Sequence, residues 1–457
     1  MAATTMKESP PVPSRRLRSY VLGNAFALYL GLIAAYVAGH LAGAGSGDLL
    51  NIRTTDFAQY YAAASMILHG HIGALYNLSA TWHLQRQIAG PTHGVFAVIP
   101  YLYPPYFALA LVPLALLPYG LAYLIWLACN CLMLSLAMFF LEGAADLGRR
   151  GTIAFRLLAL ASLPILLALG LGQVSLLLLV LCTLALVALR RGYDRAAGGL
   201  LAVASLKPAY LLPVLLVLLL TRRRRALEGY LAGVAVLIAA VLPFSGLGIY
   251  AGYLRLLRLD ESWQGGANGG FWYHGVPISS ATYAPQWNQS LAGFSQLLLP
   301  HSTAGPLYLV ASLVVVLAVA WIAWKAPSIT LPFGAAIAAG LLISPHTLMY
   351  DLAVALLPAA ACLGWRRAAK PVLIPAALIA VELAVTIGYK LAFFVPVQLA
   401  VPALVLLVGL FALVTGRLAK RSAEAEGTRS LRACAQRGSD SPDLRSREPT
   451  RGKFQST

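Results

Sequence analysis

A single carboxylate just after the first apolar segment is the residue whose type and setting best suit catalysis. Asp56 is the only acid in the stretch 54–77, and two threonines precede it. If this stretch is helical, Asp56 shares a face with Gln59, Tyr60 and Ala63. A lone carboxylate in such a place can accept a proton as a general base. The alternative is an acid that the helix dipole favours in a first turn and that does no chemistry.

Lys207 is the second candidate, because it is the only lysine between Lys7 and Lys325. It lies after the small-residue run AAGGLLAVAS and directly before Pro208. A lone cation near the boundary of an apolar segment suits a phosphate or diphosphate as its partner. A lysine that only extends its ammonium group to the membrane surface is the alternative.

Polar residues interrupt apolar runs at two further places. Gln173 divides the run LGLGQVSLL and is either a hairpin turn or also a substrate contact. His346 and Tyr350, in LLISPHTLMYDLAV, are four residues apart and share a helical face, with Asp351 following. A histidine there can donate to a phosphate or to an acceptor hydroxyl. A histidine with a purely structural role is the alternative.

The segment 246–303 is dense in Trp, Tyr and Phe among Asn, Gln and Gly. Aromatic faces pack on sugar C–H surfaces, but aromatic residues also gather at membrane interfaces for reasons of solvation alone. The polar triplet Asn288, Gln289 and Ser290, directly before an apolar stretch, is the better candidate for substrate binding.

Few other acidic residues are candidates for a catalytic carboxylate. Four lie at the ends of apolar segments among arginines and are expected to be solvated or ion-paired: Glu142, Asp146, Asp194 and Glu228. Ionisable groups near membrane segments are default functional candidates, which keeps five more under consideration: Asp48, Asp260, Glu261, Asp351 and Glu382. The chain lacks the HExxH, Walker, GxSxG and CxxC patterns, which argues against metalloproteases, ATPases and serine hydrolases.

The elements that position these residues must be membrane helices. Of the 457 residues, 59% are hydrophobic and only 11% are charged, and the mean hydropathy is +0.75. The net charge of +18 comes from short Arg and Lys clusters between apolar runs. This is the pattern of the positive-inside rule and argues against a nucleic-acid partner. We therefore expect an all-α polytopic membrane protein with about 11–12 membrane segments.

The charge bias predicts the arrangement of the chain. A cytoplasmic basic arm (1–19) precedes a membrane domain (20–416), and a disordered cytoplasmic tail (417–457) follows it. Two large outer segments are expected at about 44–102 and 246–303, the first with an interfacial helix over 56–70.

Two regions admit two threadings each. Residues 103–117 either dip into the membrane without crossing it or belong to two full passes within 103–141. Residues 196–220 form either a hairpin with Lys207 at its outer tip or one long helix. The first threading is preferred in both regions, because the second leaves arginine pairs on the outer side.

Several stretches together resemble glycosyltransferase family 87, a GT-C type group that includes the mycobacterial mannosyltransferase elongating phosphatidylinositol mannosides. The resemblance covers roughly residues 20–415 and rests on the order and spacing of six blocks: DFAQYYAAASMILHGHIGALY, YLYPPYFALALVPLALLP, GQVSLLLLVL, AGGLLAVASLKPAYLLPVLLVL, WNQSL and SPHTLMYDL.

The resemblance implies a polyprenyl-phosphate-linked sugar donor, usually mannose, used on the outer side of the plasma membrane with inversion at the anomeric carbon. It gives Asp56 the catalytic role, and it matches Lys207, His346 and the block 288–290 to conserved family positions. The expected partners are the donor, a lipid or glycan acceptor and membrane lipids. No cofactor and no metal are expected, because Asp56 lacks a second acid beside it.

Two rival functions remain open from the sequence. One is a flippase or transporter for a lipid-linked saccharide, which predicts internal pseudo-symmetry and charged pairs near the bilayer midplane. The sequence shows neither, although Glu382 within a late apolar segment has no explanation. The other is a non-catalytic scaffold of envelope assembly that uses the aromatic segment as a binding surface.

Overall fold

The computed structural model describes residues 14–41, 55–89, 97–145, 148–262, 270–273, 276–279, 285–364, 382–383, 385–388, 391–392, 394–395 and 398–439. The first half contains α1 (Ser14–Leu41), α2 (Phe57–Leu68), η3 (Ile72–Ala74), α3 (Leu78–Ala89), α4 (Pro105–Ala110), α5 (Val112–Ala115), α6 (Tyr119–Ala145), α7 (Gly148–Ala161), α8 (Leu163–Leu171), α9 (Ser175–Arg190), α10 (Asp194–Ala204) and α11 (Pro208–Leu220). The second half contains α12 (Arg224–Ser245), α13 (Gly248–Ser262), β1 (Gly270–Tyr273), β2 (Val276–Ser279), α14 (Leu291–Leu298), α15 (His301–Lys325), α16 (Thr330–Ile343), η5 (Met349–Ala355), α17 (Leu356–Gly364) and α19 (Ala400–Ser439).

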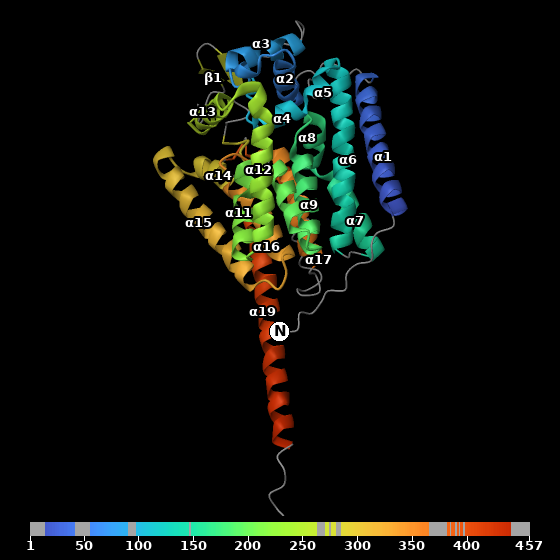
Figure 1. The fold of residues 1–457 in the computed structure, drawn as a ribbon, viewed down its shortest axis with the longest axis vertical. Coiled ribbons are helices and arrows are strands. Elements are labelled where there is room, and N and C mark those ends of the chain that lie inside the picture. The colour runs from blue at the N-terminus through green and yellow to red at the C-terminus, as the bar shows by residue number, and fades with distance from the viewer. Residues whose placement is uncertain are drawn as a thin grey trace, which may run out of the picture.

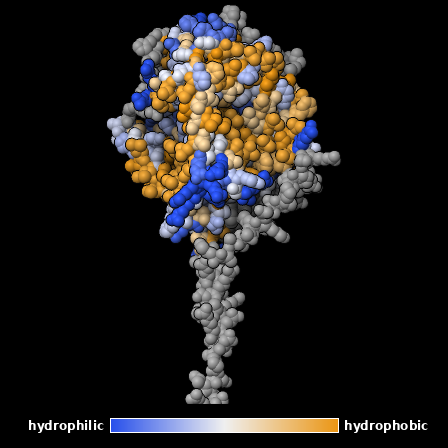
Figure 2. Space-filling view, in the orientation of Figure 1, coloured by the Kyte–Doolittle hydropathy of each residue, from blue (hydrophilic) through white to orange (hydrophobic). Residues whose placement is uncertain are grey.

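Long apolar helices run side by side through the molecule (Figure 1). In the described part of the chain, five have the length and composition to cross a membrane: α1, α6, α12, α15 and α19. The pair α8 and α9 also qualifies, and shorter apolar segments lie at 208–220, 330–343 and 349–363. Figure 2 shows a wide hydrophobic surface over the bundle, with hydrophilic residues gathered towards its ends. The predicted class, an all-α polytopic membrane protein, is confirmed.

The outer segments predicted from the sequence form one end of the bundle. The helices α2, α3 and α13 and the antiparallel pair of β1 and β2 lie together there, whereas α19 projects from the opposite end (Figure 1). The helix α2 differs from the interfacial helix that we expected. Its side chains are buried on most sides, and Phe57 and Tyr60 pack against Trp126 and Phe107. A helix of alanines and aromatics is apolar nearly all round and is therefore stable inside the protein rather than on a surface.

The short helices favour the threading that we preferred. The helices α4 and α5 have six and four residues, far fewer than the roughly 20 needed to cross a bilayer. Residues 196–220 are two helices, α10 and α11, with a break between them at 205–207, and do not form one long helix. The helix α10 packs closely on α12, where Gly198 and Gly229 leave no room for a Cβ.

The end regions differ from the sequence-based boundaries. The helix α19 continues past Arg417 and Lys420 to Ser439, where we expected a disordered tail, and residues 440–457 lie outside the described part. Most of the predicted span 371–389 also lies outside it. Three acids at helix ends form the expected ion pairs, namely Glu142 with Arg156, Asp194 with Arg223 and Glu228 with Arg195.

Candidate active site

The break between α8 and α9 brings two polar side chains into the interior. Gly172 ends α8 with φ +69°, a left-handed conformation that glycine adopts without strain. A Cβ at Gly172 would lie 3.0 Å from Phe57 Cβ. Trp126 Nε1 donates to Gly172 O over 2.7 Å, and the chain bends by 116° between the two helices. As a result, Gln173 and Ser175 are both fully buried.

Gln173 connects Asp56 with two tyrosines. Its Nε2 donates to Asp56 Oδ2, and its Oε1 accepts from Tyr60 Oη over 2.7 Å. Tyr103 Oη lies 2.9 Å from Tyr60 Oη and 3.4 Å from the same Gln173 oxygen. Because both ends of the amide are engaged, Gln173 holds one oxygen of Asp56 in a defined position. Within the part of the chain that the structure describes, Asp56 Oδ1 accepts no hydrogen bond and remains available to a ligand.

The environment of Asp56 tunes its acidity. Burial raises its pKa from 3.8 to about 6, and the hydrogen bond from Gln173 and the charge of Lys207 oppose that rise. A carboxylate with a pKa just below neutrality is ionised at pH 7 and still basic enough to take a proton in a reaction. The sequence-based hypothesis of a general base therefore has a physical basis at this position.

Asp351 is a fully buried carboxylate with four hydrogen-bond donors around it. Its Oδ1 accepts from Lys207 Nζ over 2.6 Å and from Ser175 Oγ over 2.9 Å. Its Oδ2 accepts from Tyr210 Oη over 2.8 Å and from Leu348 N over 3.1 Å. Four hydrogen bonds, one of them from an ammonium group, fix this carboxylate and compensate for its burial. It thus acts as the counter-ion that holds Lys207.

Lys207 lies directly before α11, where Pro208 occupies the first helical position. Its Nζ is 5.5 Å from the ring centroids of both Tyr210 and Tyr350. Burial by itself lowers the pKa of Lys207 and is the largest single cause. The charge of Asp351, the neighbouring Tyr103 and Tyr210, and the hydrogen bond to Asp351 together outweigh burial, so the pKa lies above its ordinary value. The ammonium group is therefore a permanent cation at neutral pH, with N–H donors beyond the one that Asp351 accepts.

His346 lies in the turn between α16 and η5. Its backbone carbonyl accepts from Tyr210 Oη over 3.1 Å and from Ser344 Oγ over 2.9 Å. Burial, together with the charge of Lys207 and against the effect of Asp351, lowers the pKa of the imidazole from 6.5 to about 4. At neutral pH the ring is uncharged. It can offer an N–H to a phosphate oxygen, but it does not bring a second positive charge.

Asn288 joins the second outer segment to the turn that carries His346. Its Nδ2 donates to Pro345 O over 2.8 Å, and its Oδ1 accepts from Thr347 N over 3.0 Å and from Ser290 Oγ over 2.8 Å. These contacts use both ends of the amide, so Asn288 positions the turn. A direct contact of Asn288 or Gln289 with substrate stays a prediction. Gln289 is buried and its Oε1 has no partner in the described part of the chain.

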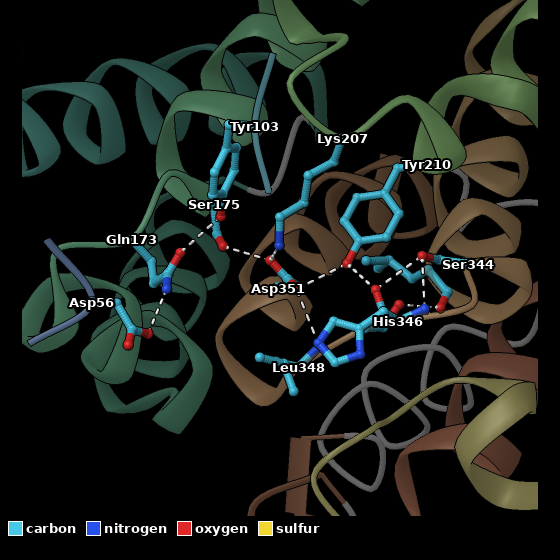
Figure 3. A network of polar contacts seen from close by, with 12 residues as sticks. Asp56, Tyr103, Gln173, Ser175, Lys207, Tyr210, Ser344, His346, Leu348 and Asp351 are labelled. Atoms are coloured by element: carbon cyan, nitrogen blue, oxygen red, sulfur yellow. Dashed lines mark hydrogen bonds and ion pairs between the residues drawn. The ribbon is translucent and has the colours of Figure 1, made fainter. Parts of the chain in front are cut away.

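Figure 3 shows how these groups meet. The structure brings five of the sequence-predicted residues into one region, namely Asp56, Gln173, Lys207, His346 and Tyr350. Tyr60 reaches the same region through Gln173. Gln59 is buried in α2 and donates its backbone N–H to Asp56 O over 3.2 Å, but its side chain makes no hydrogen bond to the network among the described residues.

Sequence reasoning missed three members of the network, Tyr103, Ser175 and Tyr210, and kept Asp351 only as one of several acids under consideration. Asp351 had a signal, because it is one of few acids near an apolar segment, but nothing near it in the sequence names Lys207 as its partner. Ser175 follows Gln173 by two residues, and Tyr210 follows Lys207 by three. Ser175 and Tyr210 could have been found from the sequence because each lies close to a polar residue that interrupts an apolar run.

The described residues contain no group of three or more His, Cys, Asp or Glu side chains placed to hold a metal ion. Independence from metal stays a prediction.

Comparison with known proteins gives one match. The model of glycosyltransferase family 87 matches residues 101–345, more than half of the 457-residue chain. The matched region contains Gln173, Lys207, Asn288 and Gln289. It ends shortly before Asp351, and its Gln173 and Lys207 contact Asp56 and Asp351. No curated protein and no solved structure matches the chain. The chain belongs to glycosyltransferase family 87, and is thus a glycosyltransferase built on a bundle of apolar helices.

Proposed function

We propose that this protein is an inverting glycosyltransferase, specifically a mannosyltransferase, that uses a polyprenyl-phosphate-linked donor at the outer face of the membrane. The acceptor is a hydroxyl of a lipid or glycan, and Asp56 is the general base. One observation carries the proposal. Asp56, with an available oxygen and a pKa of about 6, lies close enough to the partly buried cation Lys207 for that charge to lower the pKa of Asp56.

The reaction needs one base and one site for an anionic leaving group. The acceptor oxygen attacks the anomeric carbon from the face opposite the phosphate, and its proton passes to Asp56 Oδ1. The bond between the anomeric carbon and the phosphate oxygen breaks, and the polyprenyl phosphate leaves with the electron pair. Inversion by single displacement requires only one carboxylate, unlike the acid and base pair of glycoside hydrolases. Gln173 keeps Asp56 directed by holding its other oxygen.

The leaving phosphate gains negative charge in the transition state, which N–H donors can stabilise. Lys207 supplies such donors from an ammonium group that Asp351 holds in position. His346, uncharged at neutral pH, supplies a further N–H. Because Asp351 balances Lys207, the site is not strongly cationic before the donor binds, so the phosphate is recognised through directed hydrogen bonds more than through net charge.

The position of the site supports a lipid-linked donor and the outer face. Apolar helices surround the polar network, so a hydrocarbon chain can remain in the bilayer while its phosphate reaches Lys207. The described ends of the chain, α19 and the start of α1, point away from the end that carries α2 and α3 (Figure 1). The arginine clusters lie near the same end as α19, in keeping with a cytoplasmic location for it.

The test measures label transfer by purified protein from a radiolabelled polyprenyl-phosphate mannose to a lipid extract. We expect Asp56→Asn to bind donor but to lose transfer by at least about 100-fold, the usual contribution of a general base. Asp194→Asn is the matched control, because Asp194 pairs with Arg223 at the far end of α10 and touches nothing in the network. Its transfer rate should equal that of the wild type.

Two results would contradict the proposal. Wild-type turnover by Asp56→Asn would remove Asp56 as the base. Transfer from a nucleotide-linked mannose without any polyprenyl phosphate would remove the proposed donor. An assay in reconstituted vesicles distinguishes a glycosyltransferase from the rival flippase. A flippase would move labelled donor across the bilayer without forming a labelled product.

A further inference from the structure

A cavity lies between α1, α6 and α7, and its lining includes no residue of the break between α8 and α9. It has a volume of about 270 Å³, and its lining includes Tyr20, Asn24 and Ala27 from α1, Met138 from α6, and Arg156 and Leu160 from α7. None of these residues belongs to the network of Figure 3. The active site therefore gives no account of this cavity, which we name the α1–α6–α7 cavity.

One end of the α1–α6–α7 cavity carries a charged group. Arg156 Nε and Nη2 donate to the two oxygens of Glu142 over 2.7 and 2.9 Å, and Tyr20 Oη donates to Glu142 over 2.7 Å. The guanidinium group lies 4.6 Å from the centre of the Tyr20 ring. The carboxylate is 10% exposed and the arginine side chain 37% exposed. The negative member of the pair is thus enclosed, while the cation faces outwards with the N–H donors of Nη1.

The lining changes from polar to apolar along α1. Asn24 lies one turn after Tyr20, about 6 Å further along the helix axis, and is exposed on an apolar helix. Its Nδ2 donates to Tyr20 O over 2.8 Å, and its side-chain oxygen is left as an acceptor. Ala27 and Leu28 follow, and Leu134, Met138 and Leu160 add apolar lining. Ser135 also lines the cavity, and its hydroxyl donates to Cys131 O over 2.8 Å. Along the cavity, a cationic group is followed by a neutral polar group and then by apolar side chains. An amphiphile whose charged, polar and hydrocarbon parts follow in that order would match this lining.

We propose that the α1–α6–α7 cavity binds one anionic glycerophospholipid from the bilayer. The lipid phosphate accepts hydrogen bonds from Arg156, the glycerol region meets Asn24, and one acyl chain fills the apolar part. Arginine suits this role because its planar group can keep the bidentate bond to Glu142 and still donate to a phosphate. The site depends on neither the proposed donor nor Asp56, so a failed transfer assay would leave it untouched.

Native mass spectrometry of the purified protein can count retained lipids. The wild type is mixed separately with phosphatidylglycerol, phosphatidylcholine and a polyprenyl phosphate in detergent. We expect one phosphatidylglycerol to be retained at least tenfold more tightly than phosphatidylcholine. Equal retention of phosphatidylcholine would overturn the anionic selectivity. The polyprenyl phosphate is expected to bind at the proposed active site whether or not the α1–α6–α7 cavity is filled. Tight retention of the polyprenyl phosphate that is lost when Ala27→Phe fills the cavity would overturn the assignment to a glycerophospholipid.

Two variants locate the binding. Ala27→Phe fills the cavity and leaves the ion pair intact, and the double variant R156Q/E142Q removes both charges and leaves no unpaired one. Each should weaken phosphatidylglycerol retention at least tenfold. The matched control is R195Q/E228Q, which removes an exposed ion pair between α10 and α12 and should leave retention unchanged. Unchanged retention in Ala27→Phe, with a wild-type elution profile on gel filtration, would overturn the proposal.

Discussion

Lys207 Nζ lies 2.6 Å from Asp351 Oδ1 in an ion pair that joins residues 144 positions apart in the sequence. The carboxylate is fully buried and the lysine side chain is 17% exposed. The pair therefore binds the start of α11 to η5 and presents the ammonium group at the site. Its energetics differ from those of a surface pair, because removal of one partner leaves a buried charge without compensation.

The first prediction concerns this pair. Asp351→Asn or Lys207→Met alone should lower the free energy of unfolding by about 3–5 kcal/mol, whereas the double variant D351N/K207M should recover most of that loss. Denaturant unfolding in micelles measures the cycle. The exposed pair Arg195 and Glu228 is the control and should show a coupling below about 1 kcal/mol. Additive effects of the two buried changes would show that Lys207 and Asp351 are not coupled.

The second prediction concerns the pH dependence of transfer. Asp56 must be ionised to accept a proton, and its pKa is about 6. We expect kcat/KM to fall as pH drops through about 6 and to reach a plateau above neutrality, because kcat/KM reports the free enzyme. Titration of His346 adds no further change in kcat/KM near neutral pH, since the pKa of His346 is about 4. A profile that stays flat from pH 5 to 7.5 would exclude Asp56 as the titrating base.

The third prediction concerns Gln173. Its hydrogen bond to Asp56 stabilises the ionised carboxylate and holds the pKa of Asp56 below the value that burial alone would produce. The pH at which kcat/KM falls on the acid side of the rate profile, its acid limb, should therefore be higher in Gln173→Leu. Tyr60→Phe, which removes only the O–H that Gln173 Oε1 accepts, should move the limb in the same direction by less. A limb at the wild-type position in Gln173→Leu would contradict the role of Gln173 in positioning Asp56.

The fourth prediction concerns stability. The folded protein raises the pKa of Asp56 from 3.8 to about 6, so the folded state binds this proton more tightly than the unfolded state. The resulting stabilisation is complete below about pH 4 and is lost as pH rises through about 6, an effect on the order of 3 kcal/mol. Asp56→Asn should abolish this part of the pH dependence and unfold no earlier than the wild type at pH 7.5. Thermal unfolding scans at pH 4.5 and 7.5 measure both effects, and a lower midpoint for Asp56→Asn at pH 7.5 would refute this account.

Much of the candidate site could be predicted from the sequence because the background is apolar. Asp56, Gln173, Lys207 and His346 stand out as polar residues at breaks between hydrophobic runs, where an ionisable or amide group is costly without a function. The helical class follows from the same composition, since backbone groups in a membrane must be satisfied within helices. The positions of the arginine clusters likewise predicted the break between α10 and α11 at Lys207.

Only the tertiary structure decided which of these groups meet. Three contacts each join segments that are distant in the sequence. Lys207 pairs with Asp351, Gln173 donates to Asp56, and Asn288 accepts from Thr347 N in the turn that carries His346. The neutral state of His346 and the raised pKa of Asp56 depend on burial, which helix packing sets and composition does not reveal. Periodicity tells which residues share a face of one helix. It does not tell which other helix that face will contact, because many packings satisfy the same apolar pattern.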